Sequence, residues 1–169
     1  MAVFKTTFPV RYYETDQMAV VHHSNYIRYF ELARDEMMVQ LGFPIEKCEA
    51  ELGVIVPIVS VECHFRHPAR MGDILTASAR VDRVPMAKMR IHQEVVNQDG
   101  VLCAEGEVVL GFLDKKTFTP VRCPEVICDL FEKYTQNNKN NYASSCYWSL
   151  GDNSHSACNP SHFWRKEDS

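Results

Sequence analysis

The spacing of hydrophobic residues changes from helical to alternating part-way along the chain. Between residues 24 and 41, apolar side chains recur every three or four positions, at Tyr26, Phe30, Ala33, Met37 and Leu41. This spacing predicts one amphipathic helix of about 17 residues, roughly 25 Å long. We expect Ser24 or Asn25 to cap its start, and Gly42, with Pro44 beyond, to end it.

Runs rich in Val and Ile, many of them alternating with polar residues, flank this helix. They predict strands at 3–13, 54–67, 73–84, 87–97 and 101–113, with a short closing helix at 124–134. The order of strand, long helix and four strands predicts an α+β fold, in which a curved antiparallel five-stranded sheet wraps the helix. Such a sheet exposes its edges, so we expect pairing with a second subunit.

The last part of the chain has a different composition. Residues 137–169 hold both tryptophans and many Asn and Ser, but few aliphatic side chains. We therefore divide the chain into a domain at 1–136 and a polar C-terminal extension at 137–169, which we expect to be flexible. An alternative interpretation of the extension is that it holds a zinc site. The extension lacks the close pair of cysteines typical of such sites, so we expect no metal. The ligands of such a zinc site would be Cys146, His155, Cys158 and His162.

Charge and cysteine content narrow the function class. Eighteen Lys and Arg against 22 Asp and Glu give a net charge of −4, which argues against a general nucleic-acid binder. The seven cysteines are irregularly spaced with no CxxC motif, so we expect reduced thiols and a cytoplasmic protein. No apolar run reaches the length of a membrane span, and the N-terminal residues lack the apolar core of a secretory signal.

The segment between the first strand and the long helix carries the candidate chemistry. Residues 13–26 read YETDQMAVVHHSNY. The start of a helix presents free backbone N–H groups and a positive dipole end, both of which stabilise a developing oxyanion. Asp16 lies close enough upstream to face these amides, which suits attack on an acyl group, directly or through water. His22 and His23 add side chains that can orient a substrate.

Three stretches of this sequence are similar to a known family. YETDQMAVVHHSNYIRYFELAR, then HFRHPARMGD, then AEGEVVLGFLD followed by TPVRCPE, occur in this order. They resemble the recurrent motifs of the 4-hydroxybenzoyl-CoA thioesterase family, including the acyl-CoA thioesterases of its YbgC branch. The resemblance covers about residues 5–134. It implies a hot-dog fold and hydrolysis of an acyl-CoA thioester to a free acid and CoA.

The resemblance also implies residue roles. Asp16 falls on the family's catalytic carboxylate, as nucleophile or general base. His23 falls on the histidine of the YbgC branch, and its backbone N–H is the implied oxyanion donor. Tyr26 matches the tyrosine that closes the motif, in a supporting, substrate-binding role. Ala19 departs from the family, which commonly has glycine there. We expect no cofactor, because thiolate is a good leaving group and water is the only co-substrate.

The phosphates of CoA require cations, which the sequence offers near strand ends. The candidates are Arg66, Arg70, Lys88 and Arg90. For Arg70, an ion pair with Asp73 is the alternative. The resemblance further implies a homodimer or homotetramer.

Two other functions stay open at this point. One is a hydratase or dehydratase on the same fold, using His23 and Glu31, although the helical position of Glu31 points away from the apolar stripe. The other is a non-hydrolytic module that binds acyl thioesters or an acyl-carrier protein, which would not need the Asp16 carboxylate. The identity of the acyl group is left unspecified.

Overall fold

The computed structural model describes residues 2–134. The elements are β1 (Ala2–Pro9), a 3₁₀ turn η1 (Tyr12–Glu14), α1 (His23–Gln40), α2 (Ile45–Leu52), β2 (Val54–Ile55), β3 (Ile58–Phe65), β4 (Ile74–Val81), β5 (Lys88–Val96), β6 (Leu102–Gly111) and β7 (Leu113–Asp114). Residues 125–134 are also helical. The extension at 137–169, with Cys146, His155, Cys158 and His162, lies outside the described residues.

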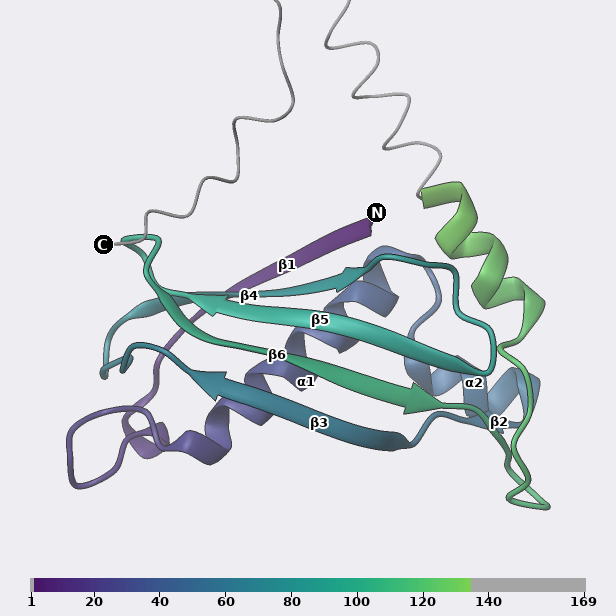
Figure 1. Ribbon diagram of the computed structural model, residues 1–169, viewed down its shortest axis with the longest axis horizontal. Helices are drawn as coiled ribbons and strands as arrows, with labels where there is room; N and C mark the ends of the chain where they lie inside the picture. The colour runs from purple at the N-terminus through teal and green to yellow at the C-terminus, as the bar shows by residue number, and fades with distance from the viewer. Residues whose placement is uncertain (1, 135–169) are drawn as a thin grey trace, which may run out of the picture.

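The strands form one antiparallel sheet crossed by α1. The order is β1-β4-β5-β6-β3, and a separate small pair joins β2 to β7. In Figure 1, α1 runs behind this sheet and covers one of its faces. The expected α+β fold, with a long helix against a five-stranded antiparallel sheet, is confirmed.

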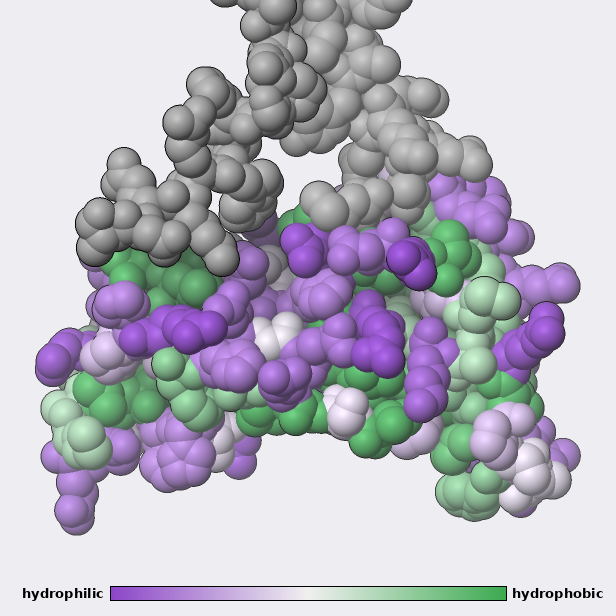
Figure 2. Space-filling view, in the orientation of Figure 1, coloured by the Kyte–Doolittle hydropathy of each residue, from purple (hydrophilic) through white to green (hydrophobic). Residues whose placement is uncertain are grey.

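Alternation along the central strands separates an apolar face from a polar one. On β5, Ile91 and Val95 are fully buried, on the same face of the strand as Gln93, whose amide donates to Phe30 O of α1. The intervening residues are more exposed and face the other side. Figure 2 shows that hydrophilic residues gather on that outer face. The core therefore lies between α1 and the sheet, as the period of two in a half-buried strand requires.

The edge strand β3 is the poorly covered part of this core. α1 packs mainly on β4 and β1 and contacts β3 little. As a result, side chains of β3 that would be buried on a central strand stay exposed: Ile58 is 47% exposed, Val61 38% and Phe65 54%. An edge strand with apolar side chains is a site for further pairing.

The structure corrects three expectations about element boundaries. The N-cap of α1 is His22, whose ring accepts from the Ser24 N–H, so the prediction of Ser24 or Asn25 as cap is wrong. The first strand ends at Pro9 rather than at residue 13, because the chain then turns into η1. α2 lies in a region where no element was predicted; it has only eight residues, too few for apolar positions to recur over several turns.

Two further findings concern the described residues alone. No helix in 2–134 is long and apolar enough to cross a membrane. The five cysteines of this region are free thiols: Cys48, Cys63, Cys103, Cys123 and Cys128.

Candidate active site

Asp16 lies in a tight loop that joins η1 to α1. A β-bridge between Thr15 and Val21 closes the loop, and the Asp16 N–H donates to Val20 O at 3.0 Å. One carboxylate oxygen, Oδ1, accepts from the Met18 N–H at 2.8 Å. The other, Oδ2, accepts no hydrogen bond from residues 2–134. Ala19 has φ 58°, in the left-handed region that favours glycine, the residue that the motif resemblance implies at this position.

Glu14 joins the two ends of this loop. Its backbone carbonyl accepts from the His22 N–H at 2.9 Å and from the Asn25 side-chain amide at 2.7 Å. Its buried carboxylate accepts from the Arg11 N–H at 2.6 Å and closes η1. Burial, with the Glu14 carboxylate close by, raises the pKa of Tyr29 far above its ordinary value. The sequence did not point to Glu14 or Asn25, because their role depends on a contact across the loop.

The first turn of α1 supplies an unused donor. The Asn25 N–H donates to His22 O at 2.9 Å, and the Ser24 N–H points to His22 Nδ1 at 3.4 Å. The N–H of His23 has no acceptor within the described part of the chain. This amide lies at the positive end of the helix dipole, so it can stabilise a negatively charged oxygen.

Asp16 and His23 both line one pocket of about 300 Å³, the candidate active-site pocket. Its lining residues are Asp16, Val20, Val21, His23, Tyr26, Phe65, Arg66, His67 and Pro68. Four of the predicted site residues therefore meet here, namely Asp16, His23, Tyr26 and Arg66. Phe65 and His67 were not predicted. The Phe65 ring contacts the rings of Tyr26 and His23, at centroid distances of 5.4 and 6.4 Å.

Tyr26 fixes the wall of the pocket. Its hydroxyl accepts from the Ala69 N–H at 3.2 Å, and the carbonyl of Ala69 accepts from the Val21 N–H at 2.8 Å. The backbone of one buried residue, Ala69, thus ties the loop, the helix and the segment after β3 together. Burial raises the pKa of Tyr26, so its hydroxyl stays protonated at neutral pH.

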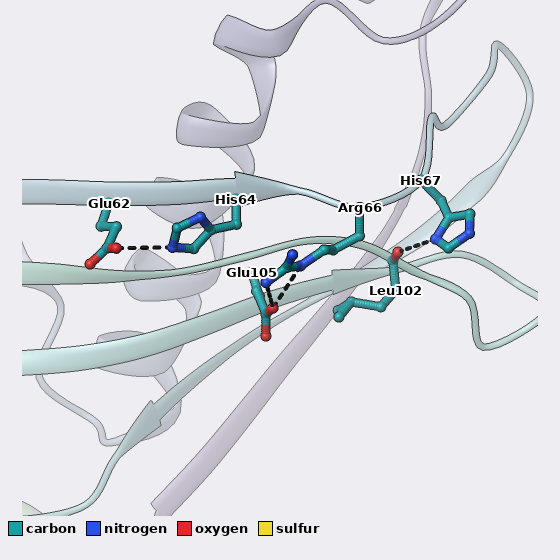
Figure 3. A network of polar contacts seen from close by, with 6 residues as sticks. All are labelled: Glu62, His64, Arg66, His67, Leu102 and Glu105. Atoms are coloured by element: carbon teal, nitrogen blue, oxygen red, sulfur yellow. Dashed lines mark hydrogen bonds and ion pairs between the residues drawn. The ribbon is translucent and has the colours of Figure 1, made fainter. Parts of the chain in front are cut away.

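Arg66 sits at the mouth of the pocket within a polar network. Its Nε and Nη2 contact Glu105 Oε1 on β6 at 2.8 and 2.6 Å, as Figure 3 shows. Next to it, His67 Nδ1 contacts the carbonyl of Leu102 at 3.2 Å. The Arg66 side chain is half exposed, so its guanidinium is accessible from solvent despite the ion pair with Glu105.

The other predicted cations lie elsewhere. Lys88 and Arg90 line a separate hollow of about 450 Å³ at the start of β5, and Arg90 pairs with Glu107 at 2.6 Å. Measured along the strands, Lys88 lies seven residues, about 23 Å, from the part of the sheet that contains Phe65. The side chain of Arg70 forms no ion pair within residues 2–134; instead, its backbone N–H donates to the Asp73 carboxylate at 2.7 Å.

Comparison with known proteins agrees with this arrangement. A family model described as the thioesterase-like superfamily matches residues 10–131, which include every residue that lines the pocket. The chain belongs to the thioesterase-like superfamily. The family suggested by the sequence motifs is thereby confirmed.

Relatives in the thioesterase-like superfamily match nearly their whole length. The chain is 31% identical over 129 residues to the acyl-CoA thioester hydrolase YbgC of Escherichia coli O6:H1, covering 75% of this chain and 95% of that one. It is 29% identical over 129 residues to the acyl-CoA thioesterase YbgC of Helicobacter pylori strain 26695, covering 72% and 94%. The crystal structure of a DHNA-CoA thioesterase from Staphylococcus aureus superposes with a TM-score of 0.73 at 26% identity, covering 85% and 96%. The predicted hot-dog fold is therefore confirmed.

Proposed function

We propose that this chain is an acyl-CoA thioesterase, which hydrolyses a thioester to a free acid and CoA, and that residues 1–136 perform the reaction. One observation carries the proposal: Asp16 and His23 line the same pocket, and within residues 2–134 one carboxylate oxygen of Asp16 and the His23 N–H make no hydrogen bond. The activities named for the two YbgC relatives support it.

The reaction needs a nucleophile and an oxyanion donor. Either Asp16 Oδ2 attacks the thioester carbonyl carbon, or it takes a proton from a water that attacks. The electrons displaced from the C=O bond move onto its oxygen, which the His23 N–H stabilises. Collapse of this intermediate breaks the C–S bond and releases CoA as thiolate, which takes up a proton. If Asp16 attacks, water then hydrolyses the mixed anhydride. Both routes consume one water molecule.

The exposed β3 edge points to a homodimer as the smallest active unit. Antiparallel pairing of two β3 strands would satisfy the backbone N–H and C=O groups at their edges and continue the sheet. It would also reverse the second subunit, so that the start of its β5 lies at the same end of the joined sheet as the first subunit's pocket. Three strand spacings, about 14 Å, separate them. Lys88 and Arg90 of the second subunit then act with Arg66 on the CoA phosphates. The free thiols fit a reducing compartment such as the cytoplasm.

Replacement of Asp16 tests the proposal. With a panel of acyl-CoAs, Asp16→Asn should lower thiol release at least a hundredfold, because it removes the nucleophile or base. The matched control is Asp129→Asn, an exposed carboxylate on the closing helix, which should keep the wild-type rate. If Asp16→Asn retains that rate, the role of Asp16 is wrong. Tight binding of acyl-CoA with no thiol release from any substrate would instead indicate a binding module.

A further inference from the structure

A second cavity, of about 150 Å³, lies under the middle of α1. We call it the Arg34 chamber. Three polar residues line it, Glu31, Arg34 and Asp35, together with an apolar floor of Met37, Met38, Ile45, Val56, Ile58, Met89 and Leu110. Cavities of this size accommodate a benzene-sized group, and methionine-rich walls adapt to different apolar shapes.

Arg34 has unused hydrogen-bond donors in this chamber. Only 7% of the residue is exposed, yet its single hydrogen bond within residues 2–134 goes from Nη1 to Gln93 Oε1 at 3.1 Å. Gln93 is also buried, and its own side-chain N–H already donates to Phe30 O at 2.6 Å. Glu31 and Asp35 act on Arg34 electrostatically but form no ion pair with it in the described part of the chain. Among the described residues, the fully buried side-chain nitrogens and oxygens without a partner belong to Tyr29 and Arg80, so the remaining N–H groups of Arg34 are accessible and can donate to a group that enters the chamber.

An apolar strip joins the chamber to the candidate active-site pocket. It consists of the α1-facing side chains of β3, namely Phe65, Cys63, Val61 and Ile58. Phe65 lines the active-site pocket and Ile58 lines the chamber, and α1 leaves the strip partly exposed between them. From Tyr26 to Arg34 the helix advances eight residues, about 12 Å, which is within the length of a medium acyl chain.

We infer that the Arg34 chamber binds the far end of the acyl group and selects acyl groups that end in an uncharged oxygen, such as a hydroxyl. This inference rests on the proposed function and names a substrate class for the same site. The apolar strip holds the methylene chain, and the free N–H groups of Arg34 donate to the terminal oxygen. A terminal carboxylate is disfavoured, because Glu31 and Asp35 outnumber Arg34 in charge.

Three acyl-CoAs of equal chain length test this in the wild-type protein: octanoyl-CoA, ω-hydroxyoctanoyl-CoA and suberoyl-CoA, which ends in a carboxylate. A hydrogen bond to a charged donor predicts that kcat/KM for the hydroxyl substrate exceeds that for octanoyl-CoA by about tenfold or more. Suberoyl-CoA should be the poorest of the three. Equal rates for the hydroxyl and alkyl substrates would overturn the inference without any variant.

The variant Arg34→Met should reduce the ratio of kcat/KM for the hydroxyl substrate to that for the alkyl substrate to about one. Arg34→Lys, which keeps a donor, should retain part of the preference. The control is Arg28→Met, an exposed arginine on the same helix, which should leave the ratio unchanged. If Arg34→Met changes the oligomeric state but not the ratio, the chamber is a subunit contact and the inference is wrong.

A binding measurement separates this inference from the proposed function. In the Asp16→Asn protein, isothermal titration should give tighter binding of ω-hydroxyoctanoyl-CoA than of octanoyl-CoA, and Arg34→Met should remove the difference. If wild-type protein hydrolyses neither thioester but this preference persists, the proposed function fails and the chamber stands. If the wild-type protein hydrolyses both thioesters with no preference between them, the proposed function stands and the inference about the chamber fails.

Discussion

Asn25 donates a 2.7 Å hydrogen bond from its side-chain amide to the backbone carbonyl of Glu14, across the loop that carries Asp16. The same carbonyl accepts from the His22 N–H, so the beginning of the loop and the first turn of α1 are held together at one oxygen. Both partners are buried. We therefore expect Asn25 to be a positioning residue, which holds the loop that carries Asp16 against the first turn of α1.

We predict that Asn25→Ala lowers kcat about ten- to a hundredfold with little change in KM, since small misplacement of reacting groups has effects of this size. Steady-state kinetics, with circular dichroism to check the fold, measure it. Gln40→Ala is the matched control: this amide also donates from α1 to a backbone carbonyl, that of Lys5, but it is exposed and at the other end of the helix. An equal loss in both variants would rule out a specific positioning role for Asn25.

Ala19 offers a prediction about stability. Its φ of 58° requires the left-handed conformation, which costs a residue with a Cβ about 1 kcal/mol relative to glycine. We therefore expect Ala19→Gly to raise the free energy of unfolding by up to about this amount, measured by urea denaturation. As a control, Ala33→Gly in the buried face of α1 should destabilise the protein, because glycine is unfavourable inside a helix. A destabilising Ala19→Gly would show that strain at this position is relieved elsewhere.

The sequence predicted those parts of the fold that have a periodic signal. The apolar stripe of α1 and the alternating strands β4 and β5 were located within a few residues, because each buries one face. The helix cap could not be predicted, since Asn25 has the side chain of a capping residue but uses it on the carbonyl of Glu14. α2 was missed because its eight residues are too few for apolar positions to recur over several turns.

The candidate site was predictable only where it is local in sequence. Asp16, His23 and Tyr26 belong to one motif and line one pocket. Phe65 and His67 follow about forty residues later, and only the position of β3 beside α1 brings them to the pocket. Lys88 was expected near a strand end. The antiparallel order puts the start of β5 at the opposite end of the sheet from the end of β3, and sequence alone does not specify which strand ends meet.

The hydrogen bonds of the Asp114 carboxylate lead us to predict that the free energy of unfolding depends on pH. Its Oδ1 accepts from the Thr117 N–H and hydroxyl and from the Lys116 N–H, and these bonds lower the pKa of the carboxyl below its ordinary value. A lowered folded-state pKa means that the ionised group stabilises the fold above its unfolded pKa, near 3.9, and that this contribution is lost as pH falls through the folded value.

Asp114→Ala should therefore lower the urea midpoint at pH 7, and its difference from wild type should narrow below about pH 4. Paired denaturation curves over this range measure the effect. Asp129→Ala, an exposed carboxylate on the closing helix, should give no such narrowing. A constant difference between Asp114→Ala and wild type at all pH values would mean that the charge of Asp114 makes no contribution.

The close approach of Gly106 to the edge strand β3 leads to a prediction about how this strand supports the candidate active-site pocket. On β6 it pairs with Cys63 of β3, and a Cβ at this position would overlap the backbone carbonyl of Glu62. Backbone atoms on a paired strand cannot move aside without displacing the strand. Gly106→Ala should therefore shift β3 away from β6 and disturb Phe65 and Arg66, which follow along β3. We expect a loss of about 2 kcal/mol or more in the free energy of unfolding, together with most of the thioesterase activity.

Gly111→Ala, on the same strand, separates this effect from a general intolerance of β6 to alanine. There the added Cβ would meet only Cγ2 of Val59, at 3.2 Å, and that side chain is half exposed and can rotate. We expect Gly111→Ala to keep its activity and nearly all of its stability. Melting temperatures and thiol-release rates of the two variants provide the comparison. If Gly106→Ala melts like Gly111→Ala and remains active, then close backbone contact between β3 and β6 is not what holds the wall of the pocket in place.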